Sequence, residues 1–86
     1  MEETELRTLS VLFENAPDAL LRIVGLVSRR GIALEEIALK PAAEETGMAS
    51  LRIAARLSEG ECGKLKAKLL NIIQVVDVTD ERASRE

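Results

Sequence analysis

The sequence predicts an α+β domain, a ferredoxin-like sandwich in which two helices cover one face of a four-stranded antiparallel sheet. Three observations lead to this class. Four segments carry the apolar patterning of strands, two carry helical periodicity, and their order along the chain is β-α-β-β-α-β. The length of 86 residues is that of one domain. We expect this domain at residues 6–80, between flexible tails at 1–5 and 81–86.

The first strand is expected at residues 8–14, where every second side chain is apolar and one is aromatic: Leu9, Val11 and Phe13. Residues 15–18 then break the pattern and begin a helix. Asn15 is a favourable N-cap and Pro17 is tolerated in a first turn, so the helix is expected to run from here to about Arg30. Its apolar face follows the spacing i, i+3, i+4, i+7 and consists of Leu20, Ile23, Val24 and Val27.

The next two strands are expected at residues 32–41 and 49–57, with a polar loop at 42–47 between them. The apolar positions of the second strand are not strictly alternate, which indicates a β-bulge near Glu35-Glu36. The third strand shows the cleanest period of two in the sequence. Its apolar series consists of Leu51, Ile53, Ala55 and Leu57.

The second helix follows a capping box, in which Ser58 is the N-cap and Glu61 is the third helical residue. Gly60 and Gly63 weaken the first turn, so we expect the helix to start late. One face is apolar and consists of Cys62, Leu65, Leu69 and Ile72. The β-branched run at 73–79 predicts the fourth strand, and the charged residues from 80 onward lack periodicity.

The composition argues against catalysis and against nucleic acid. The chain has no histidine, one cysteine, one aromatic residue and a net charge of −3. Cys62 therefore has no histidine to activate it, and its helical phase indicates a core residue. The adjacent carboxylates Glu35-Glu36 and Glu44-Glu45 are interpreted as solvated surface. We expect no catalytic residue, no metal site and no cofactor, and no binding of nucleic acid, which needs cations or aromatic platforms.

No apolar run approaches the roughly 20 residues that span a bilayer, and the N-terminal segment 1–5 is acidic, which is the wrong sign for a signal peptide. We therefore expect a cytoplasmic protein without a membrane partner. The loop 15–18 is the one candidate for a small ligand, because amides at a helix N-terminus can bind a carboxylate. From the residues alone, an ordinary capped helix start is the simpler interpretation of this loop.

Residues 9–39 read LSVLFENAPDALLRIVGLVSRRGIALEEIAL. The informative positions are Leu9-Ser10-Val11-Leu12, Glu14-Asn15, Pro17, Leu20, Arg22, Gly25-Leu26 and Arg30-Gly31. This pattern resembles the ACT domain of acetolactate synthase small subunits. The later positions Lys68-Leu69, Ile72, Val75 and Val78 resemble the ending of the same domain in a less specific way. The resemblance covers residues 8–80.

The resemblance implies a non-catalytic regulatory subunit. Such subunits bind and activate a thiamine-diphosphate-dependent catalytic subunit in branched-chain amino-acid biosynthesis, and many respond to valine or a related amino acid. It also implies a homodimer through the second strand, in agreement with the open edge of the predicted sheet. The chain resembles either a short class of these subunits without a second domain or an isolated domain of a longer one. The alternative is a free-standing ACT homodimer that senses a small ligand, such as an amino acid, for another client protein.

The resemblance places an effector site at Asn15, Ala16, Pro17, Asp18, Ala19, Leu20, Ile32, Ala33 and Leu34. Three positions depart from the family. Asp18 replaces a glycine, Ala33 replaces an asparagine and Ile32 replaces an aromatic residue, whereas Asn15 is retained. We therefore expect weak or altered amino-acid feedback, because Asp18 adds a Cβ and a like charge beside the ligand carboxylate. The alternative is that Asp18 turns outward and pairs with Arg22.

Overall fold

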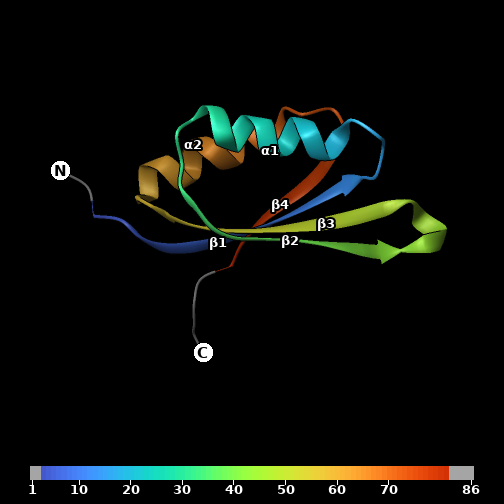
Figure 1. Cartoon of the computed structure of the whole chain (residues 1–86), viewed down its shortest axis with the longest axis horizontal. Coiled ribbons are helices and arrows are strands. Elements are labelled where there is room, and N and C mark those ends of the chain that lie inside the picture. Colours follow the sequence, from blue (N-terminus) through green and yellow to red (C-terminus); the bar gives the residue numbers. More distant parts are fainter. Residues whose placement is uncertain (1–2, 82–86) are drawn as a thin grey trace.

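The computed structural model describes residues 3–81, and for residues 42–44 it describes the backbone only. The elements are β1 (Glu5–Glu14), α1 (Ala19–Arg29), β2 (Leu34–Ala43), the short 3-10 helix η1 (Glu44–Thr46), β3 (Met48–Leu57), α2 (Glu59–Leu70) and β4 (Val75–Glu81). The strands form one antiparallel sheet in the order β2-β3-β1-β4. Both helices cover the same face of this sheet (Figure 1), so the predicted ferredoxin-like α+β class is confirmed.

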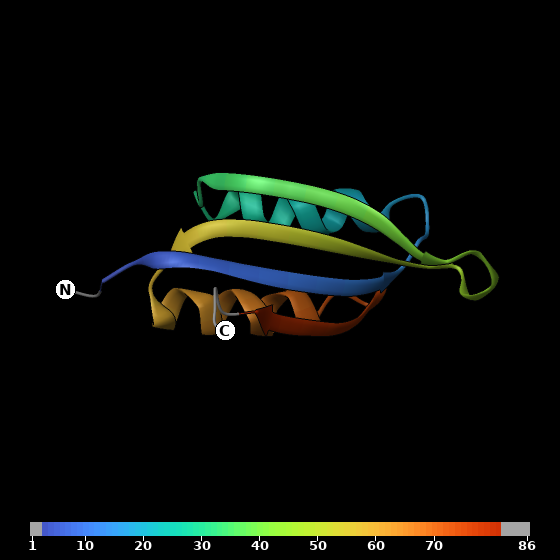
Figure 2. The ribbon, with the colours of Figure 1, turned by 90° about the horizontal axis from the view of Figure 1, so that it is seen from below.

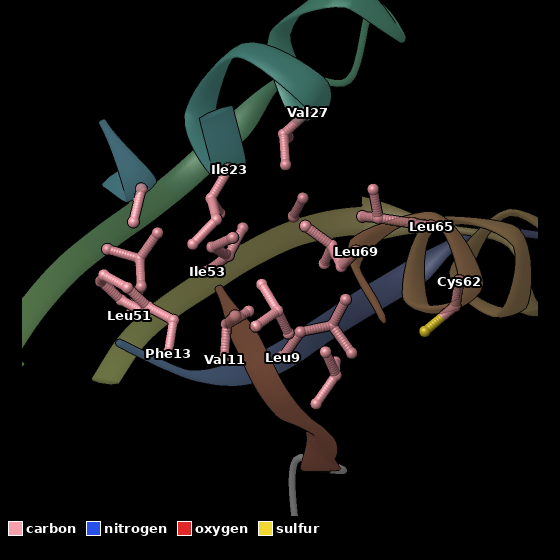
Figure 3. Close-up of a cluster of buried hydrophobic side chains, with 14 of the residues drawn as sticks. Leu9, Val11, Phe13, Ile23, Val27, Leu51, Ile53, Cys62, Leu65 and Leu69 are labelled. Atoms are coloured by element: carbon pink, nitrogen blue, oxygen red, sulfur yellow. The ribbon is translucent and has the colours of Figure 1, made fainter. Parts of the chain in front are cut away.

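The two helices divide the sheet between them. Seen from the sheet side, α1 lies behind β2 and β3, whereas α2 lies behind β1 and β4 (Figure 2). The core fills the space between the two layers, and its side chains converge from both (Figure 3). The largest fully buried members are Leu9, Val11, Phe13, Ile23, Val27, Leu51, Ile53, Leu57, Leu65 and Leu69. Each such side chain contributes about 1.5 to 3 kcal/mol through its removal from water.

The start of α1 differs from the prediction. Asp18, not Asn15, is the N-cap. The backbone N–H of Asn15 donates instead to the carbonyl of Gly47 at 2.9 Å, and that of Ala16 donates to the carbonyl of Glu14 at 2.8 Å. The first bond ties the loop to the residue just before the start of β3, and the second closes a local turn, so the chain turns before α1 begins at Ala19.

The start of α2 confirms the capping box. The amide of Glu61 donates to the Ser58 hydroxyl at 3.1 Å, and the Glu61 carboxylate accepts from the amide of Ser58 at 2.8 Å. The expected late start is wrong, because α2 begins directly at Glu59. The reciprocal bonds supply acceptors to the first turn and offset the low helix propensity of Gly60 and Gly63.

The edge strand β2 confirms the predicted bulge, since its pairing with β3 shifts between Leu34 and Glu36. The strand lies two residues later than expected at both ends. Gly31, at a φ of 73°, turns the chain out of α1, and the residues that follow it cross from the helix to the sheet edge. At the other end Gly47, at a φ of 69°, reverses the chain into β3, so that β2 pairs with β3 as far as Ala43.

The last strand is shifted toward the C-terminus. It was expected at 73–79, with residues 81–86 as a tail, but β4 includes both Asp80 and Glu81. Residues 82–86 and 1–2 lie outside the described part of the chain, and Glu5 of the expected N-terminal tail belongs to β1. The reason for the extension of β4 is a partly buried ion pair. Asp80 accepts a hydrogen bond from Arg7 Nη2 at 2.5 Å, and Arg7 is only 3% exposed.

None of the helices within residues 3–81 has the length and apolar character needed to cross a bilayer.

We expect Asp80→Ala to lower the free energy of unfolding by about 3 kcal/mol, because Arg7 would keep its burial and lose the carboxylate that accepts from it. The measurement is urea unfolding followed by circular dichroism. The matched control is Glu81→Ala, one residue further along. Its pair with Arg52 spans 3.7 Å between two well exposed side chains, so the change should stay within about 0.5 kcal/mol. Equal effects of the two substitutions would contradict this role of the buried pair.

Candidate functional site

The loop between β1 and α1 and the first two residues of α1 hold the first six candidate residues at one end of the sheet. Asn15, Pro17 and Asp18 are exposed, whereas Ala19 is buried under the first turn of α1. The two backbone bonds described above fix the loop to Gly47, just before the start of β3, and to Glu14. Ala16 and Leu20 pack against the core at its border. Hydrogen bonds therefore hold the backbone of the loop in place, while its polar side chains face solvent.

The side chain of Asp18 points along α1 toward Arg22 and does not fold back to cap the first turn of the helix. Its Oδ2 accepts from Arg22 Nε at 2.8 Å, and its Oδ1 accepts from Gln74 Nε2 at 3.4 Å. This is the paired orientation named above as the alternative, and Asp18 makes no capping bond to the helix. The hydrogen bond from Arg22 lowers the pKa of Asp18 below its ordinary value. The pair is therefore complete at neutral pH and is lost only as the pH falls through that lowered pKa.

The second group of candidates, residues 32–34, lies at the opposite end of α1 (Figure 1). The helix has 11 residues, which corresponds to roughly 16 Å at the standard rise per residue. Ile32 is half-buried, and Ala33 and Leu34 are exposed. A single chain therefore does not bring the two groups of candidate residues together.

The outer edge of β2 is apolar. The strand is bonded to β3 on one side and ends the sheet on the other. Three large side chains remain partly uncovered on it: Leu34, Ile37 and Leu39 are 37%, 42% and 50% exposed. Ile37 and Leu39 pair with Ile53 and Leu51 of β3, both of which are buried under the helices. This edge thus continues the core surface out to solvent.

Curated acetolactate synthase small subunits are similar in sequence to this chain. The identity to that of Mycobacterium avium is 37% over 83 residues, covering 92% of this chain and 49% of the relative. The identity to that of Buchnera aphidicola subsp. Baizongia pistaciae is 35% over 79 residues, covering 87% of this chain and 48% of the relative. The chain therefore spans about half the length of the curated relatives it matches. No protein-family model matches it.

Solved structures agree with this similarity. The acetolactate synthase small subunit from Thermotoga maritima superposes with a TM-score of 0.82 at 22% identity, covering 92% of this chain and 48% of that chain. The ACT domain from GTP pyrophosphokinase of Chlorobium tepidum superposes with a TM-score of 0.79 at 18% identity, covering 91% and 99%. The chain has the fold of an ACT domain and is similar in sequence to acetolactate synthase small subunits. The resemblance inferred from residues 8–80 is thereby confirmed.

The ACT domain buries its one cysteine. Cys62 is 2% exposed, belongs to the core cluster, and lies 3.6 Å from Asp80 Oδ2 through its Sγ. Burial raises the pKa of the Cys62 thiol, with the nearby Asp80 carboxylate as a second cause, so the thiol stays protonated and poorly nucleophilic. The prediction of a core residue is confirmed. Among residues 3–81 no group of three potential ligands is placed to hold a metal ion.

The paired carboxylates are solvated as far as they are described. Glu35, Glu36 and Glu45 are exposed, and the side chain of Glu44 lies outside the described part. Sequence reasoning missed Arg7, whose buried guanidinium pairs with Asp80 through Nη2 and has Nη1 3.5 Å from Glu5 Oε2. The signal was available, because Arg7 continues the alternation of Leu9, Val11 and Phe13 and must face the helices.

Proposed function

We propose that this ACT domain regulates a thiamine-diphosphate-dependent acetolactate synthase in branched-chain amino-acid biosynthesis, as a non-catalytic subunit that binds and activates the catalytic one. The observation that carries the proposal is the sequence similarity of 35% to 37% over about nine-tenths of this chain to proteins named small subunits. The protonated, buried Cys62 supports a role without chemistry, since it is the chain's only thiol.

The proposed subunit is a homodimer in which two β2 edges pair. An open strand edge presents unpaired backbone groups, and a two-fold axis can join two such edges into one continuous sheet. The partly exposed Leu34, Ile37 and Leu39 support this contact, because they would be covered by the partner copy. A domain of 86 residues also gains stability from association, since its own core is small.

The dimer would also join the two halves of the proposed effector site. A two-fold axis sets the β2 strands antiparallel, so the start of β2 in one copy lies beside the end of β2 in the other. The β1–α1 loop lies at the same end of the domain as the end of β2 (Figure 1). Asn15 to Leu20 of one copy would therefore approach residues 32–34 of the partner subunit, and an amino acid would bind between them.

The function is tested by reconstitution with the catalytic subunit from the same organism. We expect this chain to raise the rate of acetolactate formation several-fold and to have no turnover alone, because it supplies contacts and no reacting group. The control is the same chain unfolded by heat before addition. An unchanged rate at saturating ACT domain would reject the function and would favour a sensor for another client.

The dimer is tested by sedimentation equilibrium. We expect a mass of twice 9.4 kDa for the natural chain. Leu39→Lys should raise the dissociation constant of the dimer by about tenfold or more, because it puts two like charges into one apolar interface. Val76→Lys is the matched control, since Val76 lies on β4 and is 54% exposed, and it should leave the mass unchanged. A natural chain that stays monomeric at about 100 μM, well above the dissociation constants of stable dimers, rules out the β2 contact.

The effector site is tested by titration calorimetry with valine. We expect a dissociation constant of about 1 mM or weaker for the natural chain. The side chain of Asp18 occupies the place of a glycine, and Ala33 offers no amide. The pair of Asp18 with Arg22 offsets part of the repulsion between Asp18 and the ligand carboxylate. The absence of contacts from a glycine backbone at 18 and an asparagine amide at 33 therefore accounts for most of the weaker binding.

The double variant Asp18→Gly with Ala33→Asn should gain binding, to about 100 μM or tighter. Ala67→Asn adds an amide on the exposed surface of α2 and serves as the control, without any gain. Micromolar binding of valine by the natural chain is the result that overturns the expected weak feedback.

A further inference from the structure

A groove of about 550 Å³ lies between α1 and the C-terminal end of α2. Half-buried Leu26 and Ile72 form its inner wall, and both pack against the core. Leu21 of α1 and Ile73, which follows α2, line the same groove and are 75% and 87% exposed. These two are the most exposed large hydrophobic side chains in the described part of the chain. The groove therefore exposes apolar surface that the domain itself does not cover.

The rim of this groove is basic, although the chain as a whole is acidic. Arg22, Arg29 and Lys68 line it together with one carboxylate, Asp18, whereas the net charge of the chain is −3. Asp18 is already paired with Arg22. Arg29 and Lys68 make no ion pair with any side chain that the structure describes. Two cations thus remain available beside the exposed apolar side chains.

Arg29 is held against its own helix at this groove. Its Nη1 lies 3.3 Å from the position that a Cβ on Gly25 would take. A glycine inside a helix costs about 1 kcal/mol relative to alanine, and here it leaves room for the end of the Arg29 side chain beside α1. The cation is exposed and lines the groove.

We propose that this groove is where an acidic amphipathic helix of the catalytic subunit docks. The apolar side of such a helix would cover Leu21 and Ile73, and its carboxylates would meet Arg29 and Lys68. The assignment of the partner rests on the proposed function. Charge complementarity decides against a second copy of this chain as the occupant. Two grooves that face each other across a two-fold axis would bring the cations of both copies into one interface.

The test measures the affinity of the purified catalytic subunit for immobilised ACT domain. Leu21→Asp combined with Ile73→Asp should weaken binding about 30-fold or more, because both apolar anchors become charged. Arg29→Glu combined with Lys68→Glu should weaken it about tenfold and should also flatten its dependence on salt concentration. All four side chains are exposed, so these variants should keep the circular dichroism spectrum of the natural chain. The charge reversal should lower the melting temperature by a few degrees, because Arg29 and Lys68 lie in the last turns of α1 and α2.

The matched controls lie outside the groove. Val76→Asp repeats the apolar-to-acid change on β4, and Lys64→Glu repeats the charge reversal on an exposed position of α2 outside the groove. Both should bind as the natural chain does. Hydrogen exchange of the wild-type complex gives a second, independent readout, with protection expected at residues 18–29 and 68–73.

Each outcome decides the matter. If the natural chain binds and the groove variants bind equally well, the groove is not the docking site, while the proposed function stands. If the natural chain does not bind the catalytic subunit, both proposals are wrong. If the groove variants lower the oligomer mass in sedimentation, the occupant is a second copy and the proposal is overturned.

Discussion

The alternation of side chains along β1 is the constraint on which the rest of the structure depends, because β1 is bonded to a strand on each side. Leu9, Val11 and Phe13 face the helices, so the residues paired with them in β3 and β4 must face the helices too. A slip by one residue would turn this whole set toward solvent. Arg7 obeys the same alternation although it is charged. Its burial therefore requires a carboxylate on the neighbouring strand, and Asp80 of β4 supplies it.

The elements that the sequence predicted well are those decided by local patterns. Three such predictions are confirmed: the capping box before α2, the bulge in β2 and the apolar series of β3. Each of them depends only on residues that are close together in the sequence. The misplaced ends depend on contacts between distant residues. Asn15 is taken out of the helix by the carbonyl of Gly47, and Asp80 is drawn into β4 by Arg7, which is 73 positions away. The periodicity of apolar residues within one segment does not reveal such contacts between distant residues.

The candidate site shows the same limit in another form. Residues 15–20 and 32–34 are close in the sequence, and the resemblance groups them as one site. In the structure, α1 holds them at opposite ends of the domain. The two groups could form one site only between two copies of the chain, and the sequence pattern of one chain does not show which residues of two copies meet. The apolar edge of β2 and the basic groove between the helices are different surfaces, one at the side of the sheet and one on the helical layer. A dimer through the first leaves the second open.

Asp18 connects the β1–α1 loop with the groove. It is the last residue of the loop that holds half of the candidate effector site, and it also lines the groove through its pair with Arg22. A ligand carboxylate that approached the start of α1 would compete with Asp18 for nearby positive charge. Any shift of Asp18 would in turn change how much of the Arg22 guanidinium is available at the rim of the groove. Because coupling between two sites is reciprocal, a partner seated in the groove would alter the affinity of the loop by the same factor. The pair of Asp18 with Arg22 is therefore a physical link between the loop and the groove, and a glycine at position 18 could not make it because glycine has no side chain.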